Sequence, residues 1–324
     1  MDDSIRWGIL GASAFALKTM APRLQAARGS RVVALATRDV RRAEPFRAIL
    51  PDMRVETDYA ALLDADDIDA IYVPLPNHLH VEWTLAALAA GKHVLCEKPM
   101  AMAESDFDHL IAARDAAGRL AAEAYMIVHH PQWQAVRDIL AEGALGPLGH
   151  VEVAFSFNNP DPENIRNRAG MGGGGLRDIG VYAFGAVRFA TGLEPEDLSA
   201  RLIMEQDFDT RAEVSARFPG FTYHALVSTR LAPRQSVVFH GRDGWMELTA
   251  PFNAGSYDQA ELILEVERNL RTVRRWTVTD QYILQVEAFC DSIRTGAPYP
   301  WTLEMARGTQ AMIDRAIASG ASPA

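Results

Sequence analysis

The sequence predicts an α/β protein of two domains, a doubly wound parallel sheet followed by a mainly antiparallel sheet that carries helices. Up to about residue 124, apolar strand-like runs alternate with helical stretches of about ten residues, which is typical of parallel sheets with right-handed crossovers. After Gly146 the strand-like runs follow one another with turn residues between them, as in antiparallel pairing. With 324 residues, 48% of them hydrophobic, the chain is long enough for two cores. We place the domains at 1–123 and 124–324, and leave open that the last helices pack back on the first domain.

Local patterns set each element of the first half. Continuous runs of Val, Ile, Leu and Ala without alternation are typical of strands buried on both faces. Helical stretches fill the intervals, and one of them ends at Gly91, a residue favoured just after a helix. The predicted strands are 5–11, 31–37, 68–73, 93–97 and 120–124, and the predicted helices are 17–25, 43–50, 79–90 and 105–117.

The second half changes character after a helix predicted over 132–142, which Gly143 and Gly146 close. Its strand-like runs are separated by short turns, and 218–221 and 241–244 have the composition of hairpin turns. Predicted strands are 149–157, 199–204, 212–218, 222–229, 236–240 and 245–248, and predicted helices are 176–190, 282–294 and 302–318.

Net charge and cysteine content argue against several classes of partner and site. The net charge is −10 and the pI about 5.4, and no basic run is present, which argues against nucleic acid and membrane surfaces as partners. Cys96 and Cys290 lie far apart in apolar surroundings, so we predict neither a metal site nor a disulfide framework. This usage suits a reducing cytosol, and the acidic start of the chain does not resemble a signal peptide, so we expect a cytoplasmic protein.

The first predicted strand runs into a turn at Gly11–Ala16 that partly matches a dinucleotide fingerprint. The fingerprint G-x-G-x-x-G lies between a strand and a helix, and here only Gly11 of its glycines is kept. Ser13 is small enough for a pyrophosphate to approach the backbone, and Ala16 is an accepted variant of the third glycine. Because a helix N-terminus favours an anion, we predict that Gly11, Ser13, Ala14 and Phe15 contact a dinucleotide. A plain strand–turn–helix is the alternative.

The end of the second predicted strand bears on cofactor choice. NAD-specific folds usually place an acid there, for the ribose hydroxyl, whereas this chain has Thr37 and Arg38, with Arg42 close behind. These residues could hold a 2′-phosphate, so we predict NADP, with NAD as the alternative. In that alternative Arg38 covers the adenine without selecting a phosphate.

Lysine is rare in this chain. Of 32 Lys and Arg residues, only Lys18, Lys92 and Lys98 are lysine. Arginine keeps its proton in a protein, whereas burial and neighbours can tune a lysine toward neutral pH. Lys98 directly follows Glu97 at the end of a predicted strand, so it is a candidate for proton chemistry. A surface lysine or a structural carboxylate–lysine pair is the alternative.

Four ordered segments give the chain a family resemblance: Gly11, then 74–80, 97–99 and 172–182. In this order they resemble the glucose–fructose oxidoreductase/inositol dehydrogenase/rhizopine-catabolism (Gfo/Idh/MocA) family, over nearly the whole chain. The resemblance implies a Rossmann domain, then an α/β domain with an open, mostly antiparallel sheet. It also implies NAD(P)-dependent action on sugars, polyols and related cyclic alcohols or ketones, and a catalytic Lys98 whose peptide bond to proline is often cis in the family.

Asp178 and Tyr182 are four residues apart, so they share one face of the helix predicted after the glycine run. A carboxylate and a phenol presented together can orient a polyhydroxy substrate and relay a proton. Much of the family has histidine at the second position, and the tyrosine resembles the dihydrodiol and pentose dehydrogenase branch. We predict Lys98, Tyr182 and Asp178 as catalytic, with either Lys98 or Tyr182 as the base. A core tyrosine with a satisfied hydroxyl is the alternative.

Further cofactor contacts are expected where strands end, because strand C-termini line the ligand crevice in such sheets. His80 either contributes there or packs within the next helix. Met126 and Arg166 could approach the cofactor, with a packing methionine and a solvated loop arginine as the alternatives, and His129 and His130 are interpreted as loop histidines. The full predicted cofactor set is Gly11, Ser13, Ala14, Phe15, Thr37, Arg38, Arg42, Leu75, Pro76, Asn77, His80, Glu97, Lys98, Met126 and Arg166.

Together these features predict an NADP-dependent oxidoreductase that moves a hydride between nicotinamide and a sugar, polyol or related cyclic alcohol or ketone. The leading case is an aldose 1-dehydrogenase, which oxidises an aldopyranose to a lactone. The alternatives are a cyclic ketose reductase or trans-dihydrodiol dehydrogenase, and a non-catalytic dinucleotide-binding sensor. Because a large apolar sheet face needs covering, we expect a homodimer or homotetramer.

Overall fold

The computed structural model describes residues 3–267 and 270–320. The first two residues of the first predicted domain and the last four of the second, 321–324, therefore lie outside the described residues. The chain forms two compact units. The first comprises the residues up to Met126 and Gln281–Ala306, and the second comprises Ile127–Asp280 and the residues from Arg307 onward. The chain therefore crosses between the units three times, and we describe each unit by itself.

The first unit contains a six-stranded parallel sheet in the order β3-β2-β1-β4-β5-β6. From β1 the chain adds β2 and β3 on one side of the sheet and then β4, β5 and β6 on the other side. This is the order of a doubly wound sheet, which confirms the predicted fold class. The buried faces of β1, β4 and β5 account for the apolar runs seen in the sequence. The strands are β1 Ile5–Leu10, β2 Ser30–Ala36, β3 Arg54–Glu56, β4 Ala70–Val73, β5 His93–Cys96 and β6 Ala121–Glu123.

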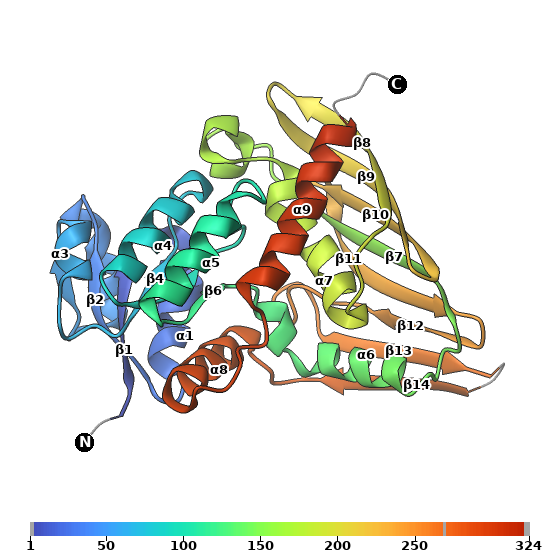
Figure 1. The fold of residues 1–324 in the computed structure, drawn as a ribbon, viewed down its shortest axis with the longest axis horizontal. Helices are drawn as coiled ribbons and strands as arrows, with labels where there is room; N and C mark the ends of the chain where they lie inside the picture. The colour runs from blue at the N-terminus through green and yellow to red at the C-terminus, as the bar shows by residue number, and fades with distance from the viewer. Residues whose placement is uncertain (1–2, 268–269, 321–324) are drawn as a thin grey trace. The chain divides into compact units, whose positions relative to one another are not determined.

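Helices pack on this sheet in two groups. α1 contacts β2 and α8, whereas α4 contacts β4, β5 and α5 (Figure 1). The helical elements are η1 Ala16–Met20, α1 Ala21–Ala26, η2 Val40–Ala43, α2 Glu44–Ile49, α3 Tyr59–Leu63, η3 Asn77–Leu79, α4 His80–Ala89, α5 Asp106–Ala117 and α8 Gln281–Thr295.

The second unit contains an eight-stranded sheet in the order β14-β13-β12-β11-β7-β10-β9-β8. All neighbours are antiparallel except β7 and β10, which are parallel. This confirms the mainly antiparallel second sheet. The strands are β7 Leu148–Asn158, β8 Asp197–Glu205, β9 Phe208–Phe218, β10 Phe221–Ser228, β11 Arg230–Gly241, β12 Gly244–Leu248, β13 Ala260–Val266 and β14 Leu270–Trp276.

Helices cover one face of the second sheet. α6 contacts β13 and α7, and α7 contacts β7 (Figure 1). The remaining helical elements are η4 Met126–His129, α6 Pro131–Ala141, η5 Ile165–Asn167, η6 Ala169–Met171, η7 Leu176–Gly180, α7 Val181–Thr191 and α9 Leu303–Gly320. Whether the sheet also joins copies of the chain stays a prediction.

The structure corrects several element predictions. Strands β3, β13 and β14 and helix α3 were not predicted, and two predicted α-helices begin with a π-helical turn, at Ala16–Met20 and Leu176–Gly180. Six of the seven residues of β14 are exposed. Its sequence therefore has no alternation of apolar and polar residues that would predict a strand. Within the described residues, no helix is both long and apolar enough to cross a bilayer.

Candidate functional site

The turn after β1 requires its glycine. Gly11 has φ +112°, a conformation that side chains disfavour. A Cβ atom there would also lie 2.7 Å from Cδ2 of Leu75. Leu75 follows β4, so the ends of the two neighbouring strands meet at this point. The structure therefore brings together two predicted cofactor residues that are distant in sequence.

The rest of the turn leads directly into the π-helical turn η1. The Ser13 hydroxyl accepts a hydrogen bond from the Ala16 N–H at 3.0 Å, which satisfies one of the free donors at a helix start. Ala14 is exposed and Phe15 is 39% exposed, and the Phe15 ring meets Tyr282 edge to face at 6.1 Å. The turn is thus exposed at Ala14 and Phe15.

The end of β2 carries the residues predicted to choose the cofactor. Thr37 is buried, and its hydroxyl donates to the backbone oxygen of Asp39 at 3.2 Å, so it shapes the turn. The Asp39 carboxylate binds the guanidinium of Arg41 at 2.9 Å, which lowers the pKa of Asp39. Arg38 and Arg42 are exposed. Arg38 makes no side-chain hydrogen bond or ion pair within the described residues.

His80 connects the end of β4 to the segment after β5. The ring is fully buried; Nε2 lies 2.8 Å from the Leu75 oxygen and Nδ1 lies 2.7 Å from the Pro99 oxygen. Burial lowers the pKa of His80, although hydrogen bonding to the two carbonyl oxygens opposes this shift. With both nitrogens facing backbone, the structure favours the packing alternative for His80. Pro76 and Asn77, which precede the helix, are partly exposed beside Leu75.

Glu97 and Lys98 lie just beyond β5, and the Lys98–Pro99 peptide bond is cis, as the resemblance implies. The Glu97 carboxylate accepts from the Tyr72 hydroxyl at 2.7 Å and from the Lys98 N–H at 3.3 Å. Burial raises the pKa of Glu97 to about 7, although Tyr72 and the charge of Lys98 oppose this rise. Beside Lys98 there is thus a carboxyl group that gains or loses a proton near neutral pH.

Sequence reasoning missed Glu123, which fixes the backbone after the lysine. Glu123 is 2% exposed, and its carboxylate accepts from the Met100 N–H at 2.9 Å and from the Trp301 indole N–H at 3.0 Å. Together, His80 and Glu123 therefore hold Pro99 and Met100 from two sides. Because glutamates are mostly exposed, a buried one needs partners, but these partners lie too far away in sequence to be seen in it.

In the second unit, Asp209 holds the glycine run, and it too was missed. Its carboxylate accepts from the Leu176 N–H at 2.8 Å, and burial raises its pKa. A Cβ atom on Gly174, which has φ +123°, would lie 2.5 Å from an Asp209 oxygen, and one on Gly173 would lie 2.5 Å from the Arg166 oxygen. The glycines thus let the start of η7 approach β9 closely.

This arrangement sets the position of Asp178 and Tyr182. Asp178 is 8% exposed, and its carboxylate binds Nε of Arg166 at 2.6 Å, so the structure pairs two of the predicted residues. Tyr182 is 6% exposed, and its ring lies 5.7 Å from that of Phe155 and 5.8 Å from that of Phe252. Asp178 lies in the π-helical turn η7, and Tyr182 lies in the first turn of α7, which follows it. π-Helical turns of this kind are frequent at functional sites.

The residues around the end of the first unit have structural partners. Met126 is 1% exposed, and the Gln285 amide oxygen accepts hydrogen bonds from the backbone N–H groups of Tyr125 and Met126. His130 is 1% exposed and caps α6, which corrects its interpretation as a loop histidine. Burial lowers the pKa of His130 to about 4.

Two family models match the chain. A model described as an oxidoreductase family with an NAD-binding Rossmann fold matches residues 5–125. A model of the GFO/IDH/MocA C-terminal domain matches residues 133–247. The first covers all six strands of the first sheet, and the second covers β7 to β12 of the second sheet, up to residue 247.

Individual relatives match nearly end to end. An uncharacterised oxidoreductase of Rhizobium meliloti is 39% identical over 96% of each chain. A protein of Haloferax volcanii named D-xylose 1-dehydrogenase (NADP(+)) 2 is 31% identical over 90% of this chain and 89% of its own length. Among solved structures, a 3-ketoreductase from Actinomadura kijaniata in complex with NADP and TDP-benzene has a TM-score of 0.89 and 32% identity over 98% of each chain.

Proposed function

Because the chain is an oxidoreductase that belongs to the Gfo/Idh/MocA family, we propose that it transfers a hydride between NADP and a sugar, polyol or related cyclic alcohol or ketone. The leading case is oxidation of an aldopyranose at C1 to a lactone. The observation that supports this most strongly is the junction at the ends of β1, β4 and β5. There Leu75 packs on Gly11, and His80 joins Leu75 to Pro99, directly after Lys98.

The first unit has residues that fit a dinucleotide. The φ of Gly11 and the close approach of Leu75 leave room only for backbone, and Ala14 and Phe15 are exposed at a helix start, where N–H groups favour an anion. Arg38 supplies an exposed guanidinium suited to a 2′-phosphate. The cofactor would supply the hydride acceptor at its nicotinamide, and Pro76 and Asn77 would border that ring.

The proton is the protein's task. In oxidation, one of Lys98 and Tyr182 would accept a hydrogen bond from the substrate hydroxyl as the deprotonated base and take up its proton, while the other donates a hydrogen bond to the same oxygen. In reduction the protonated base would return that proton to the carbonyl oxygen. Asp178 would accept from a neighbouring hydroxyl, with Arg166 holding one side of its carboxylate. Glu97, whose pKa is about 7, would exchange a proton with solvent near neutral pH. Which of Lys98 and Tyr182 is the base is left open.

A reductase of a cyclic ketose is the second candidate. It is favoured by the similarity to the Actinomadura kijaniata 3-ketoreductase. The same groups would then work in the opposite direction, with Lys98 or Tyr182 giving its proton to the carbonyl oxygen.

The deciding experiment is a screen of aldoses, polyols and cyclic ketones with both NAD and NADP, followed at the nicotinamide absorbance band. We expect turnover of at least one aldose with NADP, and less efficient turnover with NAD. Turnover of ketones alone would favour the second candidate. Tight NADP binding without turnover of any compound would contradict the proposal and indicate a dinucleotide-binding sensor.

A further inference from the structure

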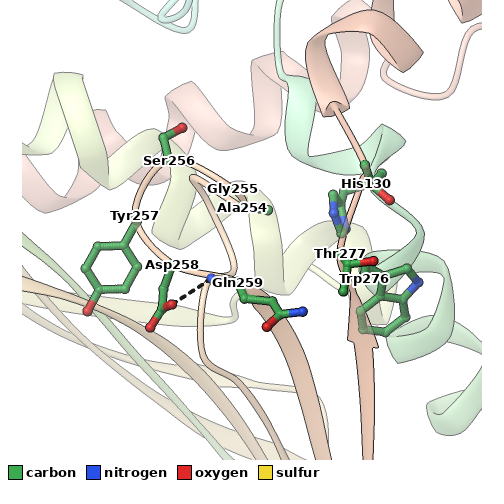
Figure 2. A pocket seen from close by; sticks show the side chains of 10 residues that line it. His130, Ala254, Gly255, Ser256, Tyr257, Asp258, Gln259, Trp276 and Thr277 are labelled. Carbon is green, nitrogen blue, oxygen red and sulfur yellow. Dashed lines mark hydrogen bonds between the residues drawn. The ribbon is translucent and has the colours of Figure 1, made fainter.

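The second unit contains a pocket of about 480 Å³ that none of the predicted site residues lines. Its walls are the loop 254–259 between β12 and β13, the end of β14 at Trp276 and Thr277, the following Thr279, and His130 at the start of α6. Figure 2 shows the loop residues on one side and His130, Trp276 and Thr277 on the other. This volume is typical of a small-molecule site, roughly 300–1,000 Å³.

His130, one of the lining residues, carries a buried hydrogen-bond donor that has no partner among the described residues, and its ring meets that of Trp276 edge to face at 6.0 Å. Nδ1 of His130 accepts from the Gln132 N–H at 3.2 Å, so in the neutral ring the hydrogen is on Nε2. Burial lowers the pKa of His130 to about 4, so the ring is neutral at pH 7. Nε2 is buried and has no hydrogen-bond partner within the described part of the chain. Because an unmade buried bond is costly, this donor points to a ligand with an acceptor oxygen.

Internal hydrogen bonds fix the loop that forms the opposite wall. The Gly255 N–H donates to the Asp258 oxygen at 2.9 Å, and the Tyr257 N–H donates to the Asn253 oxygen at 2.8 Å. The Asn253 N–H in turn donates to the Gln235 side chain at 3.1 Å. The pocket is therefore preformed on this side.

The segment just before this loop packs on Tyr182, the predicted catalytic tyrosine. Phe252 contacts the Tyr182 ring at 5.8 Å between centroids and stands two residues before Ala254, the first loop residue of the pocket wall. Two residues of extended chain span at most about 7 Å. Nearby, the Trp133 indole N–H of α6 donates to the Pro251 oxygen at 2.9 Å. The pocket wall thus starts two residues after a side chain that contacts Tyr182, and Tyr182 itself does not line the pocket.

The lining groups match a neutral polyhydroxy compound. Gln259, Ser256, Thr277 and the His130 Nε2–H can donate or accept hydrogen bonds with sugar hydroxyls, and Trp276 offers an aromatic surface for the apolar face of a ring. In Figure 2 the Gln259 side chain extends from the loop toward Trp276. The lining residues include one carboxylate, Asp258, and neither lysine nor arginine. A diphosphate group would have no cation to bind there.

We propose that this pocket is a subsite for a second, non-reacting sugar ring, so that the preferred substrate is a disaccharide or a larger saccharide. The inference rests on the proposed function, because it assigns the reacting ring to Tyr182 and Asp178 and the next ring to the pocket. Binding energy from such a remote ring can support turnover at the reacting carbon.

The test uses the full chain with NADP and two probe pairs, xylose with xylobiose and glucose with cellobiose. Saturation-transfer NMR reports binding, and the nicotinamide absorbance reports turnover. His130→Asn is the diagnostic variant, because an asparagine oxygen can still cap α6 whereas the Nε2–H donor is lost. Gln259→Ala removes a second lining group without touching the cap. His240→Asn, at an exposed histidine of β11, is the matched control.

We expect the non-reducing ring of at least one disaccharide to receive saturation, and the affinity for it to fall about 5- to 10-fold in both pocket variants. The affinity of His240→Asn for the disaccharide, and of every variant for the monosaccharides, should stay at the wild-type value. The proposal is overturned if neither disaccharide binds better than its monosaccharide, or if both pocket variants bind it as wild type does. Binding of dTDP that is lost in His130→Asn, with no disaccharide bound, would also overturn it.

Turnover separates this proposal from the proposed function. Oxidation of a monosaccharide without any preference for its disaccharide refutes the subsite alone. Disaccharide binding that depends on His130, without turnover with NAD or NADP, refutes the hydride transfer and leaves the subsite standing.

Discussion

Replacing Glu97 by glutamine isolates the cost of ionising a buried carboxyl beside Lys98. Burial raises the pKa of Glu97 from its ordinary value of 4.5 to about 7. Between these pH values the folded chain holds a proton that the unfolded chain has lost. The stabilising effect of the protonated form is therefore complete below pH 4.5 and is lost as the pH rises through 7. At about 1.36 kcal/mol for each pH unit, the loss amounts to about 3 kcal/mol.

Glu97→Gln is neutral at every pH, so it should not show this loss. Its amide oxygen can still accept from the Tyr72 hydroxyl, but its NH₂ group would face the Lys98 N–H, at a constant cost of about 1–3 kcal/mol. The diagnostic quantity is thus the change with pH. Relative to wild type, the free energy of unfolding of the variant should rise by about 2–3 kcal/mol from pH 5 to pH 8.

Urea unfolding at pH 5, 6, 7 and 8, read by hydrogen exchange of peptides from β5, measures this quantity in the first unit. A local probe is needed because a chain of two units need not unfold in a single step. Glu82→Gln, at an exposed glutamate in the first turn of α4, is the matched control and should follow wild type. Parallel pH curves for wild type and Glu97→Gln would refute the reasoning.

Two further predictions concern the ends of the cofactor and substrate regions. Arg38→Ala should weaken NADP binding about 10- to 150-fold, which corresponds to the loss of a charged hydrogen bond, and should have little effect on NAD binding. Arg47→Ala, at an exposed arginine paired with Glu44, is the control. Equal losses of affinity for both cofactors in Arg38→Ala would contradict a contact with the 2′-phosphate. Asp209→Ala leaves the Leu176 N–H without its acceptor, so urea unfolding of the second unit should show a loss of about 1–3 kcal/mol, together with a lower kcat. Asp207→Ala, at an exposed aspartate, is the control and should change neither the stability nor kcat. An Asp209→Ala variant with wild-type stability and wild-type kcat would show that the carboxylate does not hold η7.

The alternation of strands and helices was readable in the first half because buried parallel strands are continuous apolar runs. Two of the three strands that were not predicted, β3 and β14, lie at sheet edges, whereas β13 pairs with strands on both sides. β3 has three residues, and β14 carries Arg271, Arg274 and Arg275 and is exposed along its length. An edge strand is held mainly by backbone hydrogen bonds to one neighbour, so its side chains need not alternate. Its position therefore cannot be read from hydrophobicity.

Sequence reasoning identified residues that could bear the chemistry, but not those that hold them in place. The glycine run drew attention to Asp178 and Tyr182, yet Asp209, which binds the start of that segment, lies 33 positions from Leu176. Glu123 contacts Trp301 across 178 positions. Such partners follow from the tertiary fold, and a single sequence contains no periodic signal for them. His130 was interpreted as a loop histidine because it precedes a proline; its cap bond to the Gln132 N–H is local, but its burial could not be read from the sequence.

The central claim is that Lys98 acts on the reacting oxygen during hydride transfer. Single-turnover kinetics of Lys98→Met at the nicotinamide absorbance band, with the best substrate from the screen, test it most directly. The account predicts a hydride-transfer rate at least about 100-fold below wild type, with the Kd of NADP unchanged and with wild-type behaviour of Lys18→Met, which replaces an exposed lysine. A Lys98→Met enzyme that transfers hydride at the wild-type rate would contradict the account.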